Sequence, residues 1–103
     1  MPRMTKSGRA SLLIPVHGFP SVIHPAGKRF TLTELQTLVG GNIVCVAVLQ
    51  EPDGRMMFGD ANAEVTHSPV NEEATLLYTE HGYSRQPRSI VGPVVVIAPE
   101  ERP

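Results

Sequence analysis

Two adjacent glycines, Gly40 and Gly41, separate a helix-like segment from an unbroken apolar run, and this step constrains the fold more than any other feature. Before it, Thr31 and Glu34 have the spacing of a capping box, in which each side chain accepts a hydrogen bond from the other residue's backbone N–H. Gly40 easily takes the left-handed conformation that ends a helix. The sequence therefore predicts a helix between Thr31 and Gly40, too short to be stable unless it packs on a sheet.

The run that follows the glycines, Ile43 to Leu49, is apolar throughout and predicts a β-strand. Such a strand is either central, with both faces covered, or covered once and packed against another chain. A turn over "EPDG" and a partner strand over "RMMFG" complete a predicted hairpin from Ile43 to Gly59. Cys45 lies in the middle of the run, so we expect its thiol to be buried and unreactive.

The rest of the chain predicts further strands and a second helix. The segments "ASLLIPVHG" and "FPSVIHP" indicate either a β-pair or one bent strand, and Pro15 and Pro20 place at least one of the two segments at a sheet edge. A short strand is expected around Val65, and Asn71 caps a helix that ends at Gly82. The segment "IVGPVVVIAP" supplies a final buried strand, with Gly92 and Pro93 as a bulge or as the start of the strand. The expected fold is α+β, a small sheet of about five strands in the order β-β-α-β-β-α-β, covered by two short helices.

The length of 103 residues suits one domain. We expect a flexible basic arm over residues 1–9, a single α+β domain over residues 10–99 and a tail over residues 100–103. Residues 1–33 carry five Lys or Arg and no acid, which leaves contact between the arm and an acidic partner open. Both predicted helices are acidic or apolar outside, so nucleic acid is not expected as a partner.

Cysteine content and hydropathy bear on the compartment. The single cysteine excludes an internal disulfide framework and favours a reducing compartment. No apolar run reaches the roughly 20 residues that span a bilayer, and the apolar part of the leader is shorter than the roughly 7–15 residues of a signal peptide. We therefore expect no membrane attachment and a cytoplasmic protein.

No residue pattern predicts a catalytic or metal site. Four histidines occur, His17, His24, His67 and His81. Their spacing matches no metal ligand set. Glu72 and Glu73 complement the dipole of the second helix rather than form a catalytic pair. The glycines of "VGGN" end a helix and precede a strand, the reverse of their order in a phosphate-binding loop. We therefore predict no catalytic residue, no metal and no cofactor.

Four phrases in this order resemble a family borne by phages and plasmids, domain of unknown function 3846: "LQTLVGGNIVCVAV", "DGRMMFGDANAEV", "PVNEEATLLY" and "IVGPVVV". The matching residues are Leu35, Val39, Gly40, Gly41, Pro69, Asn71, Ala74, Thr75, Ile90, Val91, Gly92 and Val94. The likeness covers about residues 30–98. The loop "GDANAEV" and the long basic leader depart from the family pattern. The resemblance implies a source in a phage or mobile element and no established activity.

These observations lead to three functional hypotheses. The first is a non-enzymatic accessory protein, in the cytoplasm of the bacterial host, that binds a host protein to modulate its physiology or blunt a defence. The second is a protein that binds or sequesters a small, nucleotide-type ligand, and the third is a structural protein. The expected ligand-binding residues are Gly41, Asn42, Asp60, Asn62, Asn71 and Thr75. Because small domains bury little surface alone, a homodimer is also expected.

Overall fold

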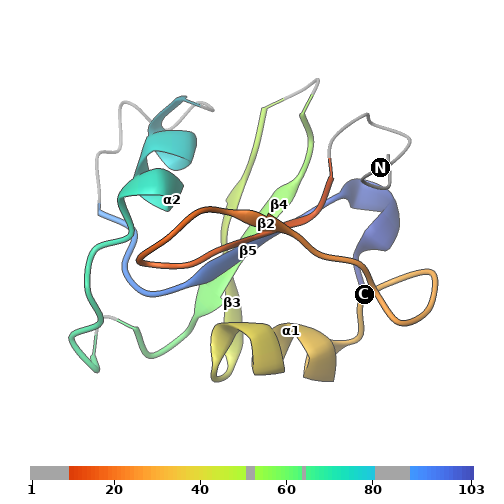
Figure 1. Ribbon diagram of the computed structural model, residues 1–103, viewed down its shortest axis with the longest axis horizontal. Coiled ribbons are helices and arrows are strands. Elements are labelled where there is room, and N and C mark those ends of the chain that lie inside the picture. The colour runs from red at the N-terminus through yellow and green to blue at the C-terminus, as the bar shows by residue number, and fades with distance from the viewer. Residues whose placement is uncertain (1–9, 51–52, 64, 81–88) are drawn as a thin grey trace.

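A computed structural model of the chain describes residues 10–50, 53–63, 65–80 and 89–103. Its helices and strands follow the predicted order β-β-α-β-β-α-β, with a short 3₁₀ helix, η2, at the end (Figure 1). The elements are β1 (Leu12–Ile14), β2 (Ser21–Val22), α1 (Leu32–Val39), β3 (Ile43–Val48), β4 (Met56–Asp60), α2 (Glu72–Tyr78), β5 (Val94–Ile97) and η2 (Pro99–Glu101).

The strands described form one antiparallel sheet in the order β2-β1-β5-β4-β3. The two helices cover its opposite faces, because α1 and α2 pack against alternate residues of β5. All four residues of β5 are buried, because this strand is paired on both sides and covered on both faces. Val94 and Val96 pack in the core beneath α2, whereas Val95 and Ile97 pack in the core beneath α1. The predicted α+β fold is therefore confirmed, as three layers with β5 at the centre.

The helix α1 begins and ends at the residues that the sequence predicts. Thr31 and Glu34 form the capping box, and the helix ends at Gly40 with a φ of 92°. Leu35 and Val39 lie on the buried side of the helix and pack beneath it with Phe30. A helix of eight residues is held by this packing rather than by its own hydrogen bonds.

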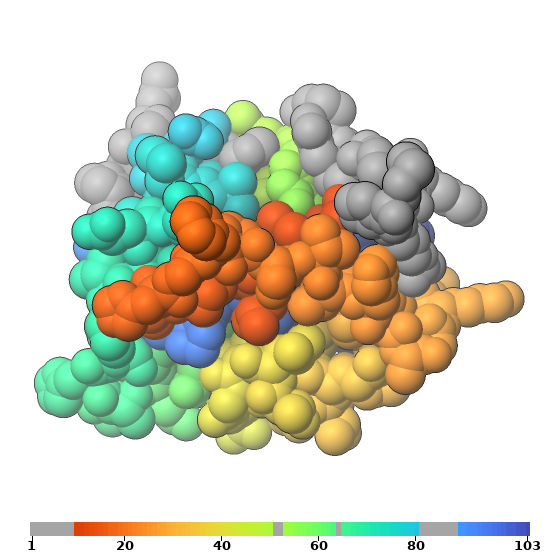
Figure 2. All heavy atoms as spheres, in the orientation of Figure 1, coloured from red at the N-terminus to blue at the C-terminus, as the bar shows by residue number. Residues whose placement is uncertain are grey.

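The first predicted pair of strands is also confirmed. β1 and β2 pair antiparallel, and β2 lies at one edge of the sheet, where the sequence places a proline-flanked strand. Figure 2 shows the segment from residue 10 to 30, in orange, crossing the viewed face between α2 and α1. This segment brings Ile23 beside α1, where it packs on the core.

The predicted hairpin from Ile43 to Gly59 is present, but β3 is not the central strand. It lies at the other edge of the sheet, with β4 as its neighbour in the described structure. Val44 and Val48 are about half exposed, at 48% and 50%. The prediction of a buried Cys45 is likewise wrong, because its side chain is exposed on this edge strand. The central position belongs to β5, whose residues are just as apolar.

One other expected element differs from the structure. The residues around Val65 form turns rather than a strand, and Val65 itself is 77% exposed. The last strand begins at Val94, directly after Gly92 and Pro93, so of the two alternatives these residues precede the strand start rather than form a bulge within the strand; Gly92 turns the chain there with a φ of 75°.

The chain ends are only partly described. The expected basic arm, residues 1–9, part of the "EPDG" turn and the expected helix end at Gly82 lie outside the described residues. The expected tail from residue 100 contains Glu101, which is 1% exposed and accepts a 2.7 Å hydrogen bond from the Ser11 hydroxyl. Residues 99–101 thus belong to the packed structure.

Candidate functional site

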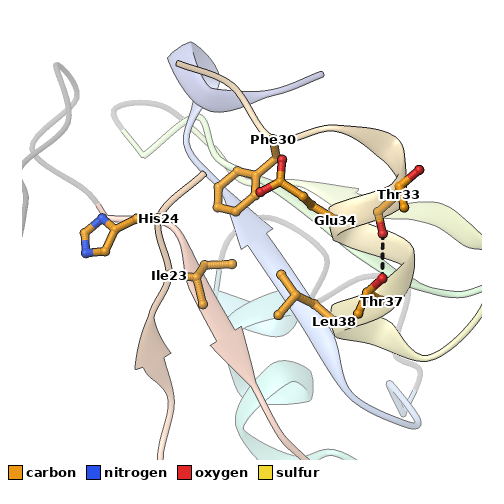
Figure 3. Close-up of a pocket in the computed structure, with 7 residues that line it drawn as sticks. All are labelled: Ile23, His24, Phe30, Thr33, Glu34, Thr37 and Leu38. Carbon is orange, nitrogen blue, oxygen red and sulfur yellow. Dashed lines mark hydrogen bonds between the residues drawn. The ribbon is translucent and has the colours of Figure 1, made fainter. Parts of the chain in front are cut away.

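The helix α1 is flanked on both sides by shallow apolar hollows. It is too short to cover its face of the sheet, so side chains from neighbouring strands and connections stay partly open beside it. We call the hollow on the side of β2 the α1 groove, which has a volume of about 380 Å³ (Figure 3). Its lining residues are Ile23, His24, Phe30, Thr33, Glu34, Thr37 and Leu38.

The floor of the α1 groove is made of three apolar side chains. Figure 3 shows Ile23 and Leu38 pointing toward one another across the groove, with the ring of Phe30 above them. Phe30 is 2% exposed, and the other two pack on the core beneath α1. His24 turns its imidazole away from this floor. The groove therefore offers a hydrocarbon surface that is fixed from below.

The carboxylate of Glu34 holds the rim of the groove in place. It accepts hydrogen bonds from the backbone N–H of Thr31 at 2.9 Å and of Ala26 at 3.1 Å. These two bonds, the one to Thr31 foremost, lower the pKa of Glu34 below its ordinary value of 4.5. Because both carboxylate oxygens are engaged, Glu34 links α1 to the preceding loop.

A second hollow lies on the other side of α1, over the β3–β4 hairpin, with a volume of about 410 Å³. Leu32, at the start of the helix, is 54% exposed beside it. The Arg102 guanidinium reaches Met56, with 2.8 Å from Nη1 to the sulfur. We call this the hairpin hollow; its lining is Leu32, Ile43, Met56, Phe58, Arg102 and Pro103.

Four of the six expected ligand-binding residues meet at one end of the β3–β4 hairpin. The Asp60 carboxylate accepts a 2.9 Å hydrogen bond from the backbone N–H of Asn62, and the carbonyl of Asn42 accepts one of 2.7 Å from Ala61. Gly41 approaches Asp60 so closely that an added Cβ would lie 3.1 Å from the carboxylate. These are the contacts of the turn that follows β4, at the end of the hairpin opposite the loop that joins its two strands.

The other two expected residues lie elsewhere and serve the fold. Asn71 is fully buried; its side-chain oxygen caps α2, and its amide donates to Ile14 and Gly92 at 2.9 and 3.0 Å. The Thr75 hydroxyl donates to the Asn71 carbonyl and accepts from the backbone N–H of Ile90. Each polar atom of the Asn71 side chain is thus engaged inside the protein.

A third hollow, of about 210 Å³, borders this end of the hairpin on the face that carries α2. Among the described residues its walls are mainly valine side chains, and Asp60 lies at its border. A carboxylate close to aliphatic walls attracts cations and repels phosphate groups. The hollow therefore suits a nucleotide poorly, although it adjoins residues expected to bind one.

The residues described provide no metal site of three or more His, Cys, Asp or Glu side chains. Within the same residues, no helix combines the length and the apolar character needed to cross a membrane.

Sequence reasoning missed both the α1 groove and the ion pair of Asp53 with Arg55. The groove joins residues from three separate segments, and its apolar residues show in the sequence only as ordinary core candidates. The signal for the ion pair was an acid and a base two residues apart in a predicted turn. The arginine binds both carboxylate oxygens, at 2.7 and 2.9 Å, and the carbonyl of Ala10 at 2.9 Å.

The chain was compared with protein families, with curated proteins and with solved structures. A family model described as a domain of unknown function (DUF3846) matches residues 10–102. No curated protein and no solved structure matches the chain.

Proposed function

This chain belongs to the family of domain of unknown function 3846, and we propose that it is a non-enzymatic accessory protein of a phage or mobile element that binds a host protein. The observation that carries the proposal is the α1 groove: an apolar floor of Ile23, Phe30 and Leu38 with a polar rim. An apolar centre within a polar rim is the usual anatomy of a protein–protein contact.

The chemistry of the groove favours a protein side chain over a small polar ligand. Small-ligand sites place a few free polar groups so that they converge on the ligand. Here both Glu34 oxygens already accept backbone hydrogen bonds. The Thr37 hydroxyl donates a 2.9 Å hydrogen bond to the Thr33 carbonyl, and the His24 side chain points away from the groove floor. The floor of the groove presents hydrocarbon to a partner, which suits a leucine or aromatic side chain of another protein.

Quantitative affinity capture from a lysate of the bacterial host tests this proposal. The variant Thr37→Arg places a long charged side chain over the groove from an exposed helical position, where arginine is a good helix former. Thr79→Arg makes the same change at an exposed position after α2, on the opposite face of the sheet. We expect the wild type and Thr79→Arg to enrich the same host protein, and Thr37→Arg to lose it at least about tenfold.

Two outcomes would contradict the proposal. One is that no host protein is enriched by the wild type over an unrelated tagged protein of similar size. The other is that Thr37→Arg captures the same protein as strongly as Thr79→Arg. Circular dichroism of both variants establishes that each is folded before the comparison is made.

Small-ligand binding stays as a second candidate because Gly41, Asn42, Asp60 and Asn62 meet beside the 210 Å³ hollow. A thermal-shift series with nucleotides and with small organic cations tests it, since a ligand that binds only the folded state raises the unfolding temperature. An Asp60→Asn variant should lose any cation response. The absence of stabilisation by either class at millimolar concentration would end this candidate.

A further inference from the structure

The two edges of the sheet are built differently. The edge strand β2 has two residues and is flanked by Pro20 and Pro25, which cannot donate to a neighbouring strand. The edge strand β3 has six residues, none of them charged and none of them proline. Monomeric proteins usually protect a long edge strand with charge, proline or a covering segment. The sequence protects β2 in this way and leaves β3 suited to pairing.

The backbone at the start of β3 is oriented for a further strand. The Ala61 N–H donates to the Asn42 carbonyl at 2.7 Å, and Val44 pairs with Gly59 of β4. In an antiparallel ladder, residues that bond to one neighbour alternate with residues that face the other side. Ile43 and Cys45 therefore direct their backbone N–H and C=O groups toward the outer edge.

Side chains on both faces of β3 are partly uncovered. Val44 is 48% exposed and shares the face of Gly59, toward the core beneath α2. Cys45 is exposed on the opposite face, opposite Phe58, which packs with the core beneath α1. A strand added beside β3 would extend the sheet and cover apolar surface on both of its faces.

We infer that the occupant is β3 of a second copy of this chain, paired antiparallel about a two-fold axis near Val44. A two-fold axis brings each segment against itself, which brings like charges together in most strands. From Gly40 to Gln50 this chain has no charged residue, so self-pairing carries no such penalty. Ile43 of each copy then faces Cys45 of the other. The outward backbone N–H and C=O groups of these two residues form hydrogen bonds with the other copy.

The dimer is concentration-dependent. A bulge between Cys45 and Ala47 interrupts the ladder, so regular pairing is confined to the first half of the strand. A contact of this size buries less than the roughly 1,000 Å² of a stable interface. This dimer goes beyond the proposed host-protein binding and uses a surface separate from the α1 groove, so either can fail without the other.

Sedimentation velocity of the full chain tests the inference. The wild type is expected to shift toward twice its 11.2 kDa mass as its concentration rises to about 1 mM, where a contact with a Kd of roughly 1 mM is substantially formed. Val44→Lys adds a charge that the two-fold axis brings against itself, and it should hold the chain at the monomer mass. Val22→Lys, on the other edge, is the matched control and should leave the shift unchanged.

A second readout uses the wild type alone and does not depend on any variant folding. Pairing covers Cys45, so its rate of labelling by a maleimide should fall about twofold between a dilute sample and one at about 1 mM, where roughly half of the chains are paired. A chain that stays monomeric to about 1 mM overturns the inference. So does a wild-type shift that persists in a folded Val44→Lys variant, or a Cys45 labelling rate that does not change with concentration.

Discussion

The side-chain amide of Asn71 lies 2.9 Å from the backbone carbonyl of Ile14, 57 residues earlier in the chain. The same amide donates to Gly92 at 3.0 Å, while the side-chain oxygen accepts from Ala74 in the first turn of α2. One buried residue thus starts a helix and fastens it to β1 and to the turn before β5.

Replacement of this asparagine should be costly. We expect Asn71→Ala to lower the free energy of unfolding by about 3 kcal/mol, because it removes a helix cap and leaves two buried carbonyls without their donor. Urea unfolding measures the loss. The control Asn62→Ala, at an exposed turn position, should change stability by less than about 0.5 kcal/mol. A loss below about 1 kcal/mol for Asn71→Ala would show that the amide is dispensable.

The capping carboxylate of Glu34 predicts a pH dependence of stability. Its folded-state pKa lies below the ordinary 4.5, so the charged form is favoured by folding. The stabilisation is therefore fully present above pH 4.5 and is lost as the pH falls through the lower folded-state pKa. Denaturant unfolding of the wild type and Glu34→Gln from about pH 6 to pH 3 checks this. The stability gap between them should narrow toward low pH, and a constant gap would refute the assignment.

The ion pair of Arg55 with Asp53 should be structurally essential. Both side chains are buried, and Arg55 also reaches Ala10 at 2.9 Å. We expect Arg55→Met to lower the free energy of unfolding by roughly 3 kcal/mol, since the buried Asp53 carboxylate loses its guanidinium. Arg55→Lys keeps the charge but not the two parallel hydrogen bonds to the carboxylate, so its loss of unfolding free energy should be smaller than that of Arg55→Met but not zero. Equal stability of the wild type and Arg55→Met would contradict the prediction.

The left-handed residue that ends α1 gives a further test. Gly40 has a φ of 92°, and no heavy atom lies within 4 Å of the position that a Cβ would take. Gly40→Ala should therefore cost about 1 kcal/mol through backbone strain alone. Gly27 has equally open surroundings and no positive φ, so Gly27→Ala is the matched control and should be neutral or slightly stabilising. Thermal unfolding of the two variants separates these effects.

The elements that the sequence predicts best are those whose cause lies within a few residues. The capping residues Thr31 and Asn71 and the terminating Gly40 act on the helix turn beside them. Their effect can be read without knowledge of the rest of the chain. The hairpin of β3 and β4 is similar, because its two apolar runs are close together and joined by turn residues.

The position of a strand in the sheet could not be predicted in the same way. β3 and β5 are both apolar runs, and composition does not say which one receives a neighbour on each side. That depends on β1, which pairs with β5 about 80 residues later in the chain. The prediction that Cys45 is buried is wrong for this reason, since its burial depends on a neighbour that β3 lacks in the described structure.

The residues of the candidate site also divide into contacts that the local sequence predicts and contacts that depend on distant parts of the chain. Gly41, Asn42, Asp60 and Asn62 meet because the hairpin brings its two ends together, which local pattern predicts. Asn71 does not join them, because its donors are used by distant carbonyls that no local pattern indicates. The α1 groove also depends on tertiary contacts, since Ile23 and Leu38 come from separate elements that pack against the same core.

The central place of β5 makes the two halves of the sheet depend on a single strand. Of the strands described, Val94–Ile97 is the last along the sequence, yet the β1–β2 pair and the β3–β4 hairpin are joined through it. Each of the two cores takes two of its buried side chains from this strand. Neither core can therefore close before β5 has docked, and we expect the two pairs of strands to fold and unfold as one cooperative unit.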